Sequence, residues 1–118
     1  MPVYEGSIRV TQLPRLSHLQ FVVVGILRNG WIPGRTVREE LKRFEIRKSG
    51  PAFYQLMARL EDAGLVKGKY DQEIVDGQII RQRHYTLTSD GSRAWEASRD
   101  FYMTVIRGLD PAAGAAGA

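Results

Sequence analysis

An Asp-Gly pair at positions 76 and 77 constrains the fold of this chain more than any other sequence feature. It separates two stretches, 65–75 and 78–87, in which apolar residues are interleaved with charged ones. Asp-Gly is a strong signal for a two-residue hairpin turn because both residues tolerate a positive φ. A tight turn fixes the register. The expected cross-strand pairs are Val75 with Gln78, Gly68 with Tyr85, and Val66 with Leu87. The sequence therefore predicts a β-hairpin that is anchored at its base and solvated along much of its length.

A first helix is predicted to begin after Ser17. Ser17 and Gln20 have the spacing of a capping box, in which each side chain accepts a hydrogen bond from a free backbone N–H. Apolar residues from Leu19 to Leu27 fall nearly all round the helix, which indicates a central, buried element that ends at Asn29-Gly30. The β-branched run is also compatible with a strand, but the length and the cap favour a helix.

Two further helices are predicted before the hairpin. A short link, 31–34, leads to a helix over 35–44 with Val37, Leu41 and Phe44 on its inner face. The third helix is expected over 50–63, with Ser49 as its N-cap and Pro51 in its first turn. Its inner stripe comprises Phe53, Leu56, Met57 and Leu60.

A final helix follows the hairpin, capped by Thr88 or Ser89 and extending to about Gly108. Its broad apolar stripe packs either within the chain or against a second subunit, and in so small a domain we expect part of it to form a dimer interface. The expected interface residues are Trp95, Ser98, Phe101, Tyr102, Val105, Ile106 and Leu109. The expected organisation is an N-terminal arm over 1–14, a core domain over 15–87, a dimerisation helix over 88–109 and a disordered tail over 110–118.

Composition narrows the functional classes. The 118 residues suit one domain, and the absence of cysteine removes disulfides and thiolate chemistry. No apolar run is long enough to span a membrane and no signal peptide is visible, so we expect a cytoplasmic protein without a membrane partner. His18 and His84 have no ligand-spaced partner, and no catalytic motif stands out. We therefore expect no metal, no cofactor and no enzymatic activity.

The order of three helices, a hairpin and a further helix predicts an α+β, mainly helical fold of the winged helix-turn-helix type, with a two-stranded wing. In that fold the third helix enters the DNA major groove and the wing touches the adjacent backbone. The net charge of +4 is compatible with a polyanion, and six Lys or Arg face three Glu over 35–48. The start of the third helix is sterically open, and its first N–H groups are candidates for binding a phosphate.

Eleven residues are the candidate DNA contacts. For most of them a simpler interpretation remains open: the charges over 35–48 suit a solvated helix face, Tyr54 suits half-buried packing, and Arg81 and Arg83 suit protection of a strand edge. The candidates are Arg35, Arg38, Lys48, Ser49, Gly50, Ala52, Tyr54, Gln55, Arg59, Arg81 and Arg83.

The third helix and the hairpin also carry a family resemblance. A set of residues in these elements resembles the signature of PadR-like transcriptional regulators. It comprises Ser49, Phe53-Tyr54, Leu56, Arg59-Leu60-Glu61, Gly64-Leu65-Val66, Arg83, Tyr85, Leu87-Thr88 and Gly91. The resemblance covers about residues 15–107. It implies a homodimeric winged-helix repressor that pairs through its C-terminal helix and binds a palindromic operator in double-stranded DNA. It also implies a small aromatic effector, since some members sense such molecules near the dimer interface.

Some positions depart from the family pattern. Ala52, Phe53 and Gln55 replace its usual residues around the helix tyrosine, and the hairpin tip, 74–80, is apolar and partly acidic where the family is often Gly- and Arg-rich. The tip and the acidic residues Asp71, Glu73 and Asp76 favour an alternative function, a winged-helix module that binds protein and not DNA.

Overall fold

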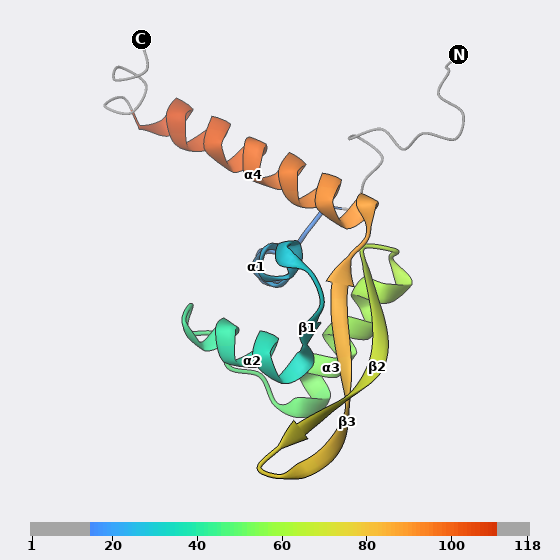
Figure 1. The fold of residues 1–118 in the computed structure, drawn as a ribbon. Helices are drawn as coiled ribbons and strands as arrows, with labels where there is room; N and C mark the ends of the chain where they lie inside the picture. The colour runs from blue at the N-terminus through green and yellow to red at the C-terminus, as the bar shows by residue number, and fades with distance from the viewer. Residues whose placement is uncertain (1–14, 111–118) are drawn as a thin grey trace, which may run out of the picture.

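The computed structural model describes residues 15–110 and shows the predicted winged-helix arrangement with one additional strand (Figure 1). The helices are α1 (His18–Ile26), the short 3₁₀ helix η2 (Leu27–Asn29), α2 (Gly34–Lys42), α3 (Gly50–Asp62) and α4 (Ser89–Leu109). The strands are β1 (Ile32–Pro33), β2 (Val66–Val75) and β3 (Gln78–Leu87). The expected N-terminal arm, and all of the expected tail except Asp110, lie outside the described residues.

The hairpin has the predicted register. Val75 lies opposite Gln78, Gly68 opposite Tyr85, and Val66 opposite Leu87. Asp76 has φ 52° and Gly77 has φ 79°, the left-handed values that a two-residue turn of this type requires. The hairpin that forms the wing is thus set by local turn chemistry.

The two-stranded wing is confirmed, and the link 31–34 adds a third strand to its sheet. β1 pairs antiparallel with β3, with Ile32 opposite Tyr85 and Pro33 opposite His84, which gives the order β1-β3-β2. Pro33 lacks an N–H and is tolerated here because β1 is an edge strand. A two-residue strand containing proline has no periodicity that the sequence could reveal.

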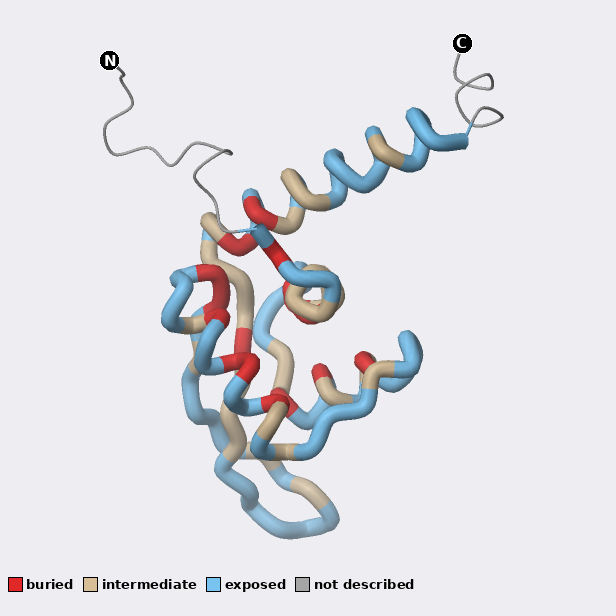
Figure 2. Tube along the Cα trace, turned by 180° about the vertical axis from the view of Figure 1, so that it is seen from behind, coloured by how far each residue is buried: buried red, intermediate tan, exposed pale blue. Residues whose placement is uncertain are grey.

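One apolar core joins the helices to the base of the wing. The inner stripe of α3, Phe53, Leu56, Met57 and Leu60, is buried as predicted. It belongs to the same buried cluster as Val66 and Tyr85 of the sheet and Ala94 of α4. Figure 2 shows this burial along the inner side of α3, on α1 and at the base of α4, whereas the distal part of α4 is largely exposed. Burial raises the pKa of the Tyr85 phenol to about 12.

Two helices are less buried than their sequences indicate. In α1 only Val23 and Val24 are buried, and Phe21, Val22 and Ile26 remain partly exposed. Phe44 was placed on the inner face of the second helix, but α2 ends at Lys42 and the Phe44 side chain is exposed. The helical spacing does not apply beyond the end of the helix. No helix within residues 15–110 is long and apolar enough to cross a membrane.

The first turn of α4 is fastened to the junction between α3 and β2. The Thr88 hydroxyl donates to the Gly64 carbonyl at 2.6 Å and accepts from the Gly91 N–H at 3.0 Å. Gly91 lies so close to Leu65 that a Cβ built on it would be 2.0 Å from the Leu65 carbonyl oxygen. Only glycine fits this position without moving the backbone.

We therefore expect Gly91→Ala to lower the free energy of unfolding by at least about 2 kcal/mol, because the clash is with backbone and not with a flexible side chain. Urea denaturation measures this loss. Gly108→Ala is the matched control on the same helix: nothing lies within 4 Å of its added Cβ, so it should be neutral or stabilising by up to about 1 kcal/mol. Equal effects of the two substitutions would contradict the packing described.

Candidate nucleic-acid interface

The outer face of α3 is uncovered by the rest of the described chain. Tyr54, Gln55, Ala58 and Arg59 are exposed, and Ala52 is partly exposed, because the opposite side of the helix supplies the core. A helix that contacts base edges in the major groove of DNA needs polar donors and acceptors with small residues between them, and these side chains resemble such a surface. Most of the α3 residues predicted from sequence are therefore together on one accessible face.

Tyr54 is at the edge of this face and has a structural role as well. Its ring packs edge-to-face on Phe53 with ring centroids 5.0 Å apart, and its hydroxyl oxygen is 3.0 Å from where a Cβ on Gly34 would lie. Gly34 therefore allows α2 to approach the ring closely. The Tyr54 side chain remains 40% exposed, so packing and an outward contact are both open to it.

Most of the first N–H groups of α3, which are candidates for binding a phosphate, have partners within the chain. Ser49 Oγ accepts from the Ala52 N–H at 3.2 Å, and the Ser49 carbonyl accepts from the Phe53 N–H at 2.9 Å. Pro51 has no N–H, so within the described residues Gly50 alone has an N–H without a partner in this first turn. The N-cap that starts the helix therefore leaves one of these donors, the Gly50 N–H, for a phosphate.

The two wing arginines are in different environments. Arg83 donates to Glu61 of α3 at 2.5 Å, and its guanidinium carbon is 5.0 Å from the Tyr70 ring centroid. The bond to Glu61 raises the pKa of Arg83. Gly68 makes room for this group, because a Cβ there would be 2.8 Å from the Arg83 Nε. Arg83 thus ties the wing to α3, a partnership that the sequence did not indicate.

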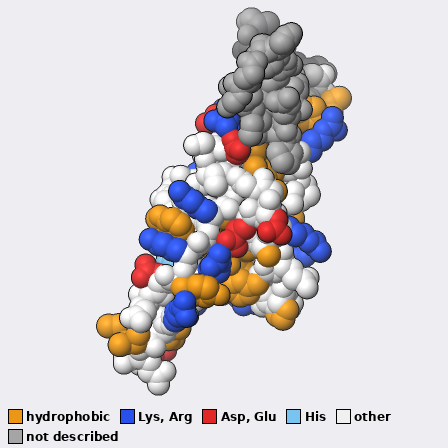
Figure 3. Space-filling model, turned by 90° about the vertical axis from the view of Figure 1, so that its right-hand side faces the viewer, with side chains coloured by type: hydrophobic (Ala, Val, Ile, Leu, Met, Phe, Trp, Pro, Cys, Tyr) orange, Lys and Arg blue, Asp and Glu red, His pale blue; other side chains and the backbone are white. Residues whose placement is uncertain are grey.

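Arg81 is exposed on the same strand and has its guanidinium carbon 4.4 Å from the Tyr70 ring centroid. Further out, Ile74 and Ile79 are cross-strand partners near the tip, with 75% and 71% of their surface exposed. Figure 3 shows Lys and Arg side chains interleaved with hydrophobic ones on this side of the molecule, and hydrophobic ones again at its lower end. The wing therefore has an apolar end, and its exposed cations Lys67 and Lys69 lie closer to its base, beside the Trp31 ring.

The remaining candidates lie around α2 and the connection after it. Arg35 forms an ion pair with Glu73 of the wing, and Glu73 Oε2 is also 3.6 Å from His84 Nε2. Arg38 Nη2 donates to the Lys48 carbonyl at 2.9 Å. These contacts bring α2, the α2–α3 connection and the wing together at one end of the molecule, beside the start of α3 (Figure 1).

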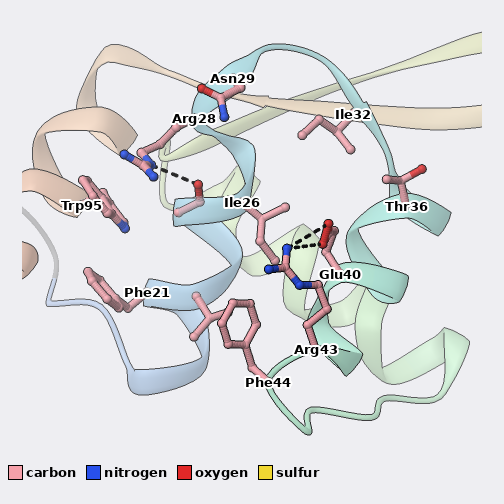
Figure 4. A pocket seen from close by; sticks show the side chains of 12 residues that line it. Phe21, Ile26, Arg28, Asn29, Ile32, Thr36, Glu40, Arg43, Phe44 and Trp95 are labelled. Atoms are coloured by element: carbon pink, nitrogen blue, oxygen red, sulfur yellow. Dashed lines mark hydrogen bonds and ion pairs between the residues drawn. The ribbon is translucent and has the colours of Figure 1, made fainter.

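A separate groove of about 520 Å³ lies between α1, α2 and the base of α4 (Figure 4). Its wall includes Trp95, which stacks nearly parallel on Phe21 with centroids 5.7 Å apart and has the Arg28 guanidinium carbon 3.9 Å from its ring centroid. Figure 4 shows Trp95 between these two side chains. Gly25 permits the close packing, since a Cβ on it would be 2.8 Å from Trp95 Nε1. The Trp95 ring is therefore engaged within the subunit.

The predicted interface residues of α4 divide into two groups. Trp95 and Ser98, near the base, are partly buried on the body of the chain. Phe101, Tyr102, Ile106 and Leu109 are exposed and Val105 is partly so, although Tyr102 still meets Phe21 edge-to-face at 5.3 Å. Among residues 15–110, no three His, Asp or Glu side chains are grouped as a metal site requires.

Comparison with known proteins identifies the fold. No family model matches the sequence, and no curated protein matches it closely enough to indicate a relationship. Solved structures do match. A PadR family transcription regulator from Clostridium difficile R20291 has a TM-score of 0.64 at 21% identity, over 79% of this chain and 98% of that one.

Two further structures give the same result. A PadR family transcriptional regulator from Eggerthella lenta DSM 2243 has a TM-score of 0.60 at 22% identity, over 75% of each chain. Bacillus subtilis PadR, solved in complex with operator DNA, has a TM-score of 0.55 at 21% identity; the match covers 66% of this chain but only 44% of that protein. The chain thus has the winged-helix fold of PadR-family transcriptional regulators.

Proposed function

We propose that this chain is a DNA-binding transcriptional regulator of the PadR type, and not an enzyme. The observation that carries the proposal is the outer face of α3, which is exposed, polar and not covered by any other part of residues 15–110 over Tyr54, Gln55 and Arg59. The fold supports it, since the similar Bacillus subtilis protein was solved with operator DNA. Double-stranded DNA is the proposed partner, and the protein would act in the cytoplasm.

Within this proposal the roles of the side chains differ. Gln55 has the bidentate amide that suits the edge of an adenine in the major groove, and Arg59 has a reach that suits a phosphate. Tyr54, Ala52 and Gly50 lie on the surface that the DNA would approach. Arg81 is the available wing contact. Arg83 is better assigned to holding the wing on α3, because Glu61 already neutralises it.

The distal half of α4 supports a homodimer. It projects beyond the body of the subunit (Figure 1) and exposes Phe101, Ile106 and Leu109, the last with 78% of its surface accessible. An apolar helix face of this kind is typical of a surface that a second copy buries. A two-fold dimer would present two α3 helices to half-sites about one helical turn apart, as a palindromic operator requires, and binding there would repress transcription.

The groove beside Trp95 is the place that we propose for a small aromatic effector. Because Phe21 and Arg28 already contact the Trp95 ring, a stacking ligand would have to displace Arg28. Such a displacement would act on α4 and hence on the dimer, which gives the ligand a route to the spacing of the two α3 helices.

One observation favours the alternative function, a module that binds protein. The wing tip exposes Ile74 and Ile79 beside Asp76, which suits a protein surface better than a phosphate backbone. Retention on heparin at two salt concentrations separates the two functions. A DNA-binding protein is retained at low salt and released at high salt, whereas an adaptor flows through both times.

Substitutions on α3 test directly whether its side chains contact DNA bases. The ligand is duplex DNA selected by the protein from a random pool. We expect Gln55→Ala to lose about 1–3 kcal/mol of preference for the selected sequence over random duplex, because a base contact is lost. Arg59→Ala should weaken binding to both by a similar factor. Fluorescence anisotropy measures both affinities. Ser92→Ala, on an exposed position of α4, is the control and should match the wild type. An unchanged sequence preference in Gln55→Ala would remove that residue from the interface.

Charge introduced on α4 tests the dimer. We expect Phe101→Asp/Leu109→Asp to shift the protein from dimer to monomer in sedimentation velocity while the far-UV spectrum is retained, because both side chains are exposed in the subunit. Arg107→Asp, at an exposed position that the helical spacing places on the other side of α4 from Phe101 and Leu109, should remain dimeric. A wild-type chain that sediments as a monomer at micromolar concentration would refute the proposed assembly.

A further inference from the structure

A hollow of about 340 Å³ lies between α2 and the connection to α3, and its lining is almost entirely cationic. Five of its six lining residues are Lys or Arg, and the sixth is Glu39: Arg35, Arg38, Glu39, Lys42, Arg47 and Lys48. The hollow adjoins the start of α3, because Arg38 Nη1 is 3.8 Å from where a Cβ on Gly50 would lie. It is therefore on the same end of the molecule as the exposed face of α3.

The chain reversal after α2 builds this hollow. Glu45 adopts φ 60°, an uncommon left-handed conformation for a residue other than glycine, and the Ile46 N–H donates to the Leu41 carbonyl at 3.1 Å. The Ile46 side chain packs against the core. The residues that follow, Arg47 and Lys48, are thereby directed back alongside α2. The hydrogen bond from Arg38 to the Lys48 carbonyl joins this connection to α2.

Little negative charge offsets these cations. Lys42 pairs with Glu39 at 2.9 Å, which lowers the pKa of Glu39, and Arg35 pairs with Glu73. Arg47 and Lys48 are exposed, and neither side chain has a carboxylate partner within residues 15–110. An excess of unpaired cations in a concave site attracts and holds an anion more strongly than the same charges on a flat surface.

The other places where this fold offers an anion site are weaker here. Within the described residues the start of α3 keeps one N–H without a partner, that of Gly50, and Arg83 of the wing is neutralised by Glu61. The wing also carries Asp71, Glu73 and Asp76. The wing cations without a carboxylate partner within residues 15–110, Lys67, Lys69 and Arg81, lie beside the rings of Trp31 or Tyr70, whereas those of the hollow gather in one concave site.

We propose that this cationic hollow binds backbone phosphates of duplex DNA beside the groove that α3 enters, and that it contributes more to the electrostatic attraction than the wing does. The inference rests on the proposed function and adds to it Lys42 and Arg47, which lie in the basic stretch 35–48 but are not among the eleven candidate contacts. Phosphodiester oxygens match the donors of Arg38, Arg47 and Lys48, and each neutralised phosphate releases condensed counterions.

The test is the salt dependence of binding to random-sequence duplex DNA, measured by fluorescence anisotropy. Each phosphate contact contributes about 0.9 to the slope of log K against log salt. Arg47→Ala/Lys48→Ala should therefore reduce the slope by about 2 and weaken binding at about 0.1 M salt roughly 60-fold. Lys69→Ala/Arg81→Ala removes two exposed cations from the wing and should reduce the slope by less than 1, about half of the effect expected in the hollow.

Two controls separate position from charge. Arg15→Ala/Arg93→Ala removes the same number of cations near the starts of α1 and α4, at the end of the molecule opposite the hollow (Figure 1), and should keep the wild-type slope. Arg47→Lys/Lys48→Arg keeps both charges in the hollow and should retain most of the slope. Equal thermal unfolding midpoints confirm that each variant is folded, as expected for exposed side chains.

The outcomes distinguish this inference from the proposed function. If the wild-type chain does not bind duplex DNA at low salt, the proposed function fails and the inference fails with it. If the wild type binds but Arg47→Ala/Lys48→Ala keeps its slope, the inference alone is overturned, including the case in which the hollow serves free phosphate only. An equal loss in the Arg15→Ala/Arg93→Ala control would also overturn it, since net charge and not the hollow would then set the affinity.

Discussion

The packing of α3 against the base of the wing is the contact on which the rest of this structure depends. Phe53, Met57 and Leu60 share one buried cluster with Val66 and Tyr85, and burial of such side chains contributes about 1.5–3 kcal/mol each. The ion pair between Arg83 and Glu61 adds a polar link between the same two elements. Because one side of α3 is committed to this contact, its other side is presented to solvent.

Local chemistry explains which parts of the fold follow from sequence alone. The Asp76-Gly77 turn determines the register of the wing, and the 3–4 spacing of Phe53, Leu56, Met57 and Leu60 identifies the inner side of α3. The capping box at Ser17 and the N-caps at Ser49 and Thr88 are also local. In each case the residues that decide the structure are within a few positions of one another.

The features that sequence did not reveal depend on residues that are distant in the chain. β1 forms because Ile32 and Pro33 pair with residues of β3 that are about 50 positions later in the chain. Arg83 meets Glu61, and Arg35 meets Glu73, so two cations predicted to face DNA are occupied within the subunit. The hollow that gathers Arg38, Arg47 and Lys48 depends on the left-handed backbone at Glu45, for which a glutamate gives no signal.

These differences change which elements we expect to contact the base edges of DNA and which we expect to contact its phosphate backbone. The wing is held by ion pairs and ends in an apolar tip, so its main contribution is to fix α3 in place. The polar outer face of α3 suits base edges, and the cations around α2 suit the backbone on either side. An interface organised in this way separates sequence preference, carried by α3, from salt-dependent affinity, carried by the hollow.

The most direct test of this account is the map of backbone amide shifts in the ¹⁵N-labelled protein as a DNA duplex is added. The account predicts that the largest changes fall on the outer face of α3, at Gln55 and Arg59, and on the connection at Arg47 and Lys48. Changes confined to the wing tip or to the groove beside Trp95, with α3 unaffected, would contradict it.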